Sequence, residues 1–178
     1  MPNLTLATVT RENPYQEFDD LFRQHYRLIY RTAFAVTGRS EDAEDVLQTI
    51  FVRLLGQEFP PDLEKNPRAY LYRAAVNASL NTLRSRRRHT QILDAGEIAS
   101  VAGTAKAESD DEIQKQLLHA IGELNTRAVE ILVLRYVHNY SDAEIAKMLG
   151  TTRGTIAVSL FRSRARIKKL MRAPGGTL

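Results

Sequence analysis

Large apolar side chains recur at spacings of three and four residues along most of this 178-residue chain. Such spacing places side chains on one face of an α-helix, whereas a half-buried strand would alternate apolar and polar residues. Near the start, the pattern is carried by Phe18, Leu21, Phe22, Ile29, Tyr30, Ala33 and Phe34. We find no β-type alternation and no internal repeat. The sequence therefore predicts an all-α protein.

Signals for helix ends divide the first part of the chain into three helices and one loop. Gly38 is suited to end the first helix, and Ser40 to cap the second. The second helix should bury Ala43, Val46, Leu47, Ile50, Phe51 and Leu54. After a loop rich in acids and proline at 57–65, Asn66 as the cap and Pro67 at the first helical position open a third helix. Its expected inward residues are Leu71, Ala74, Ala75, Ala78 and Leu83. Three helices with such short connections predict a small bundle.

The composition changes after Arg88, where we expect the third helix to end. Residues 89–112 are rich in Gly, Ala, Ser, Thr and acids, and carry a net charge of −5 from one basic and six acidic residues. Few large apolar side chains are available there to offset the entropy lost on ordering. We therefore predict two small helical domains, 1–88 and 113–178, joined by a flexible acidic linker at 89–112.

The last part of the chain has the outline of a helix-turn-helix. Ser141 and Glu144 have the spacing of a capping box at the start of a short helix, and Gly150 supplies the positive φ that ends it. A second, basic helix should begin at Arg153, and Ala146 is small where the two helices would cross. The residues expected to pack between them are Ile145, Leu149, Ile156 and Leu160.

The charge of this part favours a polyanion partner, with nucleic acid as the default candidate. Residues 113–178 carry 11 basic and 4 acidic residues, a net charge of +7. Base contacts should come from the start of the second helix, at Arg153, Thr155 and Ser159. The expected phosphate contacts are Arg162, Arg164, Arg166, Lys168 and Lys169. An ordinary α-hairpin with a solvated basic face is the alternative.

The third helix of the first domain carries a second candidate nucleic-acid surface. Its polar and aromatic residues are Tyr70, Tyr72, Arg73, Asn77 and Asn81, followed by a basic run at Arg84, Arg86, Arg87 and Arg88. Aromatic, amide and cationic side chains on one element suit single-stranded nucleic acid, whose exposed bases stack and offer their edges. A basic helix end that only complements the helix dipole is the alternative.

The acidic start of the second helix, Glu41-Asp42-Ala43-Glu44-Asp45, admits two simple interpretations. Its carboxylates complement the helix dipole, or a pair of them performs acid–base catalysis. No His, metal-ligand set or Gly-rich loop accompanies them, and the four His residues are scattered. The absence of Cys excludes a disulfide scaffold, a Cys-ligated zinc site, an Fe–S cluster and a thiol nucleophile. We expect no enzyme, no cofactor and no metal.

The sequence also lacks the patterns of a membrane span and of an export signal. No apolar run approaches the roughly 18 residues of a membrane span, and the first residues lack the basic and then apolar pattern of a signal peptide. We expect a soluble, cytoplasmic protein without membrane insertion.

Several of these motifs match a known family. In the first half, the matching residues are Phe18-x-x-Leu21 with Tyr26, Ala43-Glu44-Asp45-Val46-Leu47-Gln48-Thr49-Ile50-Phe51 and Ala69-Tyr70-Leu71-Tyr72-Arg73-Ala74-Ala75-Val76-Asn77. In the second half, they are Ser141-x-x-Glu144-Ile145-Ala146-x-x-Leu149-Gly150, Gly154-Thr155-Ile156 and Arg162-Ser163-Arg164-Ala165-Arg166. Over nearly its whole length, the chain resembles the extracytoplasmic-function (ECF) group of sigma-70 family bacterial sigma factors. A helix-turn-helix alone is weakly specific, but the acidic block upstream of it makes the combination strong.

The resemblance implies a sigma factor that binds core RNA polymerase and directs promoter-specific transcription initiation. The residues implied to dock on the clamp helices of the β′ subunit, in region 2.2, are Glu41, Asp45 and Gln48. Those implied to open and read the −10 element are Tyr70, Arg73, Asn77, Asn81, Arg84, Arg86, Arg87 and Arg88, with Asn77 as the first choice for an unstacked base. The linker would thread towards the polymerase active centre.

Region 4, at residues 113–170, is implied to read the −35 element as duplex and to pack on the β flap. Its implied DNA contacts are Arg153, Thr155, Ser159, Arg162, Arg164 and Arg166. The resemblance also implies an anti-sigma factor as a further partner. The lack of an extra N-terminal region and of a middle helical domain fits the minimal ECF type.

The chain departs from the family pattern at three places. Ala157 and Ser159 stand where basic residues are usual, so the base-reading turns should be less cationic. Asn125 replaces a frequent proline but is still a fair cap, and Tyr70 replaces a frequent Trp.

Two rival functions belong to other classes. The first is a transcriptional regulator with a LuxR-like DNA-binding domain and an unrelated helical front, which would bind duplex DNA by itself without needing Asp45 or Gln48. The second is an enzyme that uses the acidic helix.

Overall fold

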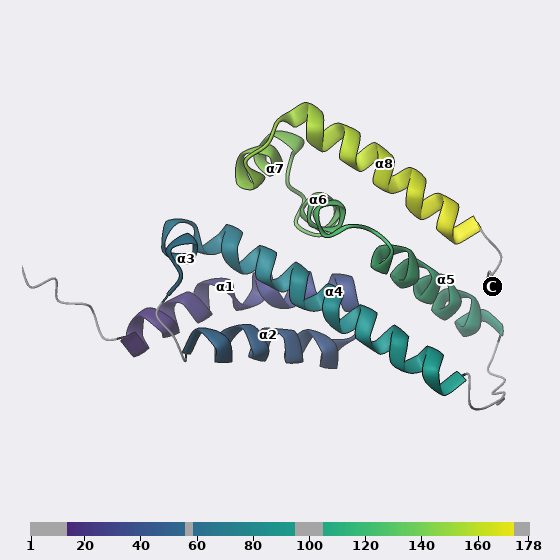
Figure 1. Ribbon diagram of the computed structural model, residues 1–178, viewed down its shortest axis with the longest axis horizontal. Helices are drawn as coiled ribbons and strands as arrows, with labels where there is room; N and C mark the ends of the chain where they lie inside the picture. Colours follow the sequence, from purple (N-terminus) through teal and green to yellow (C-terminus); the bar gives the residue numbers. More distant parts are fainter. Residues whose placement is uncertain (1–13, 56–58, 95–104, 173–178) are drawn as a thin grey trace, which may run out of the picture.

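A computed structural model describes residues 14–55, 59–94 and 105–172. Over these ranges the chain forms eight helices and no strand, which confirms the all-α prediction. The helices are α1 (Pro14–Thr37), α2 (Ser40–Leu55), α3 (Pro61–Lys65), α4 (Pro67–Asp94), α5 (Ala105–Gly122), α6 (Thr126–Tyr136), α7 (Asp142–Leu149) and α8 (Arg153–Arg172). In Figure 1, α1 and α2 form one layer, α4 runs across it, and α5 to α8 lie on the other side of α4.

The first group of helices has a core of its own between α1, α2 and α4. Its fully buried members are Ile29, Ala33, Ala43, Val46, Ile50, Phe51, Leu54, Leu63, Leu71 and Ala75. Phe51 makes T-shaped ring contacts with Phe18 and Phe22, with ring centroids 5.7 and 4.7 Å apart. The predicted inward face of the second helix is confirmed, except that Leu47 is only half-buried.

Several predicted helix ends are present as expected. Gly38 has a φ of +73° and follows α1 directly, and a Cβ at this position would lie 2.6 Å from Leu118 Cδ1 of α5. Asn66 accepts a hydrogen bond from the amide of Ala69 at 3.1 Å and so caps α4. Ser40, by contrast, is the first residue inside α2 rather than its cap.

The acidic loop predicted at 57–65 contains a short helix, α3. Proline is favoured at the first position of a helix, where no amide hydrogen is needed, and Pro61 occupies that position. Leu63 is buried in the core of the first group and holds α3 against it. One apolar residue in five was too weak a pattern to predict this helix.

Both helices that flank the predicted linker are longer than expected. Helix α4 continues to Asp94 rather than ending near Arg88, and α5 begins at Ala105 rather than near residue 113. No Gly or Pro occurs between Arg88 and Asp94 or between Ala105 and Glu112, so nothing local stops either helix. The rest of the predicted linker, 95–104, lies outside the described residues.

The helix-turn-helix forms as predicted. Ser141 and Glu144 make a reciprocal capping box, and Gly150 ends α7 with a φ of +64°. Asn125 caps α6 by accepting a hydrogen bond from the amide of Ala128 at 2.8 Å. The predicted packing residues Ile145, Ala146, Leu149, Ile156 and Leu160 are all buried.

A second core joins the two groups of helices. From α4 it takes Tyr72, Val76, Leu80 and Leu83, and from α6 it takes Ala128, Val129, Ile131, Leu132, Val133 and Leu134. Polar contacts border it: Arg31 donates to the carbonyl of Val137 at 2.9 Å, and Nε2 of His138 lies 2.8 Å from the hydroxyl of Thr32. The two predicted domains therefore pack on each other in this structure.

Candidate nucleic-acid interface

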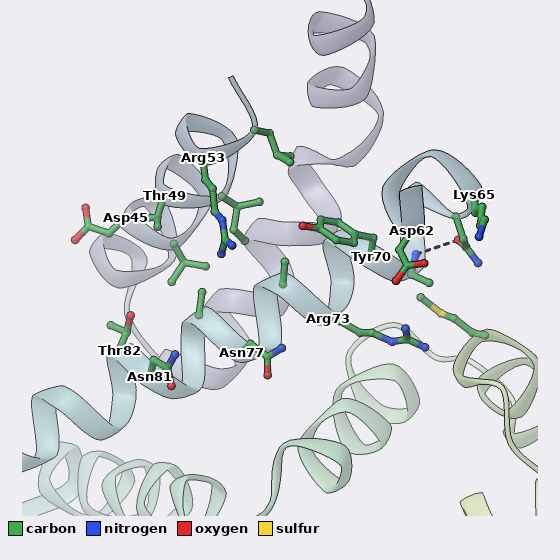
Figure 2. A pocket seen from close by; sticks show the side chains of 18 residues that line it. Asp45, Thr49, Arg53, Asp62, Lys65, Tyr70, Arg73, Asn77, Asn81 and Thr82 are labelled. Atoms are coloured by element: carbon green, nitrogen blue, oxygen red, sulfur yellow. Dashed lines mark hydrogen bonds between the residues drawn. The ribbon is translucent and has the colours of Figure 1, made fainter. Parts of the chain in front are cut away.

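A groove of about 800 Å³ lies between α2 and α4, with α3 at one end. Figure 2 shows Asp45, Thr49 and Arg53 on the α2 side and Tyr70, Arg73, Asn77 and Asn81 following one another along α4. Met148 of α7 also lines it, so the second group of helices reaches its rim. The groove is open and is lined by both polar and apolar side chains and by one aromatic ring.

The α4 side of this groove is a regular face of the helix. Tyr70, Arg73, Asn77 and Asn81 are spaced by three and four residues, which places them on one side of α4. Arg73, Asn77 and Asn81 are exposed, and Tyr70 is half-buried. We call these four residues the α4 face. The structure thus brings together half of the predicted −10 residues.

The arginines at the basic end of α4, unlike the α4 face, mostly contact other helices of the protein. Arg84 donates to the carbonyls of Gly122 and Leu124 at 3.1 and 2.9 Å, and Arg87 forms a 3.0 Å ion pair with Glu123. These contacts tie α4 to the end of α5 and the turn after it. Arg86 pairs with Asp42 of α2 and donates to the carbonyl of Thr37 at 3.2 Å.

Within the predicted −10 set, Arg88 is the exposed member of this run. Arg84, Arg86 and Arg87 are each half-buried and hold helices together.

Tyr72 does not belong to the nucleic-acid surface that the sequence suggested for it. Its side chain is fully buried in the second core, and its hydroxyl donates to the carbonyl of Glu130. Burial raises the pKa of Tyr72, and the nearby Glu130 carboxylate raises it further, so the ring stays neutral. The side chain is a packing residue between the two groups of helices.

The outer side of α2 presents a mixed acidic and apolar face. Gln48 is exposed, as is Asp45 at the edge between this face and the groove, and Val52 and Leu55 continue the same row with 66% and 55% exposure. We call Glu41, Asp45, Gln48, Val52 and Leu55 the docking face. Val52 and Leu55 extend the row beyond the three residues predicted from the sequence, at successive spacings of four and three residues from Gln48.

The carboxylate of Glu41 at the start of this face is stabilised in its charged form. The helix amide at its own position and the neighbouring Arg39 guanidinium, 3.5 Å away, lower the pKa of Glu41. The docking face therefore keeps its negative end at neutral pH.

Helix α8 presents the second predicted DNA surface. Its inner side is fixed by the buried Ile156, Leu160 and Ser163. Arg153, Arg162, Arg164 and Arg166 are exposed on the helix. Thr155 lies 2.9 Å from the hydroxyl of Thr152, which also accepts from the Thr155 amide and so caps α8.

Ser159 is half-buried beside the start of α6, in a shallow depression that Asn125 and Ala128 also line. Among the described residues, no group of three or more His, Cys, Asp or Glu is placed to hold a metal ion. Likewise, none of the helices in the described ranges is long and apolar enough to span a membrane.

Comparisons with known proteins find matches to both halves of the chain. The sigma-70 region 2 model matches residues 21–89, and the sigma-70 region 4 model matches residues 114–167. The ECF RNA polymerase sigma factor SigM of Mycobacterium tuberculosis is 32% identical over 156 residues, which cover 86% of this chain and 76% of SigM. The chain belongs to the ECF group of sigma-70 factors. RNA polymerase sigma factor CarQ of Myxococcus xanthus is 25% identical over 163 residues, covering 90% and 92% of the two chains.

Two solved structures share the fold. The sigma factor RpoE from Bartonella quintana, in complex with the anti-sigma factor NepR, has a TM-score of 0.50 at 21% identity and covers 89% of this chain and 98% of its own. CnrH, in complex with the cytosolic domain of CnrY, has a TM-score of 0.53 at 24% identity and covers 90% and 91%.

Membership of this family gives the function of the chain. It is a sigma factor that binds core RNA polymerase and promoter DNA and directs promoter-specific initiation of transcription. The region 2 match covers α2 and most of α4, so the chain is not a LuxR-like regulator with an unrelated helical front. Members of the family are initiation factors rather than enzymes.

Proposed function

We propose that this sigma factor binds polymerase and promoter DNA through three separate surfaces. The docking face of α2 binds the clamp helices of the polymerase β′ subunit, the α4 face binds unstacked bases of the −10 element, and α8 reads the −35 element as duplex. The observation that carries this proposal is the row of an aromatic ring, a cation and two amides along one side of an open groove.

The chemistry of the α4 face suits bases that have left the duplex. An unstacked base exposes both its ring face and its hydrogen-bonding edge. Tyr70 offers a ring for stacking, Asn77 and Asn81 offer donors and acceptors, and Arg73 offers a positive charge. Capturing bases in this way offsets the energy lost when the −10 pairs open.

The docking face combines features of a protein interface. Its carboxylates and amide lie at one end and exposed aliphatic side chains at the other. Apolar side chains buried on binding supply affinity, and charges at the rim set orientation. Region 4, at α6 to α8, then packs on the β flap.

The protein has no catalytic site in this scheme, because the polymerase and its magnesium ions join the nucleotides. It acts in the cytoplasm, where polymerase and chromosome meet. An anti-sigma factor holds it inactive until a signal arrives; a complex of that kind is the form in which the similar RpoE was solved. The domain boundaries 1–88, 89–112 and 113–178 remain predictions.

The test combines run-off transcription with a binding assay, using bacterial core polymerase freed of sigma factor. With the wild-type protein, transcription of genomic promoter fragments should begin at specific new sites. Asp45→Ala and Gln48→Ala should each weaken core binding by roughly tenfold, the size of a typical interface contact, and Gln48→Ala, which does not line the groove, should leave the start sites unchanged. Asp20→Ala removes an exposed carboxylate of α1 and serves as the matched control. Unchanged core affinity in both α2 variants would remove the docking assignment.

A further inference from the structure

Helix α8 exposes two large apolar side chains in its first half. Val158 is 48% exposed and Phe161 is 70% exposed. Single exposed apolar residues are common on protein surfaces. These two lie three residues apart on the proposed recognition helix, so they form one patch.

The patch lies on the outer side of α8, although Val158 at its edge also lines the shallow depression beside α6. At 3.6 residues per turn, Gly154, Val158, Phe161 and Ala165 form a row on the side of α8 opposite the buried Ile156, Leu160 and Ser163. All four residues of the row are exposed. We call this row the outward ridge.

Gly154 at the start of the ridge is not required by the protein itself. A Cβ there would meet only the Thr152 hydroxyl at 3.9 Å, an ordinary contact. Glycine inside a helix is destabilising relative to alanine. The missing side chain lets an outside surface approach the first turn of α8 closely.

The charge around the ridge selects a nucleic acid over a protein. Helix α8 carries seven basic residues and no acidic one. Arg162 and Arg166 lie beside the ridge, where they would meet phosphates as the helix enters a groove. The major groove is about 12 Å wide and admits an α-helix.

Only one feature of the major groove is apolar. The base edges present nitrogen and oxygen donors and acceptors, except for the C5-methyl group of thymine. Placing Val158 and Phe161 against the polar edges would leave those edges without hydrogen bonds, which is costly. Thymine methyl groups would instead be buried favourably.

Building on the proposed −35 role, we propose that Val158 and Phe161 read thymine methyl groups, so that this sigma factor selects −35 elements with thymines at neighbouring base pairs. Three residues of helix advance about 4.5 Å along the axis, close to the 3.4 Å rise of one base pair. The residues on either side of Val158, Ala157 and Ser159, are small and uncharged, so Val158 is not covered by long neighbouring side chains.

The test begins with the reconstituted holoenzyme on a promoter library with a randomised −35 region. Thymines should be enriched at two neighbouring positions, and Phe161→Ala and Val158→Ala should each remove the enrichment at one of them. Thymine is then replaced by deoxyuridine, which lacks only the methyl group. Initiation by the wild type should fall by roughly fourfold for each methyl removed, the value of one buried methyl-sized group.

The variants should make the deoxyuridine effect disappear, whereas the control Arg166→Ala should weaken initiation on all sequences and keep the deoxyuridine effect. Both ridge residues are exposed, so these variants should keep the wild-type circular dichroism and melting temperature. Specific initiation that is equal on thymine and deoxyuridine promoters would overturn the inference.

The inference would also be overturned if the ridge variants kept the sequence preference but lost affinity for core polymerase, since the ridge would then be a protein contact. A wild-type holoenzyme that starts nowhere specifically would contradict the proposed function instead.

Discussion

The α4 face and the outward side of α8 are built on the same helical spacing, yet they present opposite chemistry. The α4 face offers a ring, a cation and two amides inside a groove of about 800 Å³. The outward side of α8 carries an exposed apolar ridge on a helix with seven basic residues. A groove can surround a base that has left the stack, whereas a ridge fits the major groove of intact duplex. This difference supports the proposal that the two helices bind different forms of DNA.

The basic ends of the two helices sharpen this contrast. Arg84, Arg86 and Arg87 are half-buried and bind carbonyls or carboxylates of neighbouring helices. Arg162, Arg164 and Arg166 are exposed. The arginines near the end of α4 therefore fasten the fold, whereas those of α8 are exposed, with Arg164 also donating to the carbonyl of Leu160 in its own helix at 3.2 Å.

The largest expected effect is on promoter opening. The double change Arg73→Ala and Asn77→Ala removes a cation and an amide from the α4 face, and should lower initiation on duplex promoters by roughly 10- to 100-fold. Permanganate reactivity of unpaired thymines at the −10 element measures the opening. Arg23→Ala, an exposed arginine of α1, is the control. Normal opening by the double variant would break the assignment of the α4 face.

A smaller effect, on stability, should separate the two sets of arginines. Arg84→Ala removes charge-assisted hydrogen bonds to two carbonyls of the second group, and should lower the free energy of unfolding by about 2 kcal/mol. Arg166→Ala should change it by less than about 0.5 kcal/mol, because the side chain is exposed. Chemical denaturation measures both. Equal losses would show that the basic ends of α4 and α8 do not differ in role.

Within α8, base contacts and phosphate contacts should behave differently. Arg153→Ala should cost about 1–2 kcal/mol on some −35 sequences and little on others, as expected for a base contact. Arg162→Ala should weaken binding on every sequence and reduce the slope of log affinity against log salt by about one. Titration of holoenzyme against a panel of promoters at several salt concentrations gives both values. A uniform loss for Arg153→Ala would demote it to a phosphate contact.

The smallest effect is a dependence of stability on pH at the contact between the two helical groups. Burial lowers the pKa of His138 to about 4, with help from Arg31 and Arg68. The unfolded chain, with an ordinary pKa near 6.5, then binds more protons than the folded chain between these values. Stability from this residue is complete above about pH 6.5 and is lost as the pH falls towards 4.

Because His138 is only partly buried, solvent screening limits the loss to about 1 kcal/mol. Denaturation at pH 7 and pH 4.5 should show this difference in the wild type and less of it in His138→Gln. His25, whose pKa burial and Arg68 also lower, contributes equally in both proteins. An identical pH dependence in the variant would exclude His138 as its source.

The sequence predicted the local features of the fold well because they depend on neighbouring residues. The Asn66 cap, the Ser141–Glu144 capping box and the positive φ of Gly38 and Gly150 are examples. These features involve residues a few positions apart, so pattern and chemistry suffice.

Features that depend on distant parts of the chain were not predictable. Tyr72 resembles Tyr70 in the sequence, yet it is buried because α6 packs over it. Arg84 resembles Arg88, yet it binds carbonyls 38 and 40 residues away. Which side of a basic, aromatic helix meets protein and which meets DNA is decided by tertiary packing.

The proposal that α4 binds single-stranded DNA and α8 binds duplex DNA is tested most directly by measuring how the holoenzyme binds two forms of promoter DNA. One ligand is a single strand carrying the −10 element, and the other is a duplex carrying the −35 element. The Arg73→Ala and Asn77→Ala double variant should lose affinity for the single strand and keep it for the duplex. Arg162→Ala should show the reverse. If either variant lost affinity equally for the single strand and the duplex, the account would be contradicted.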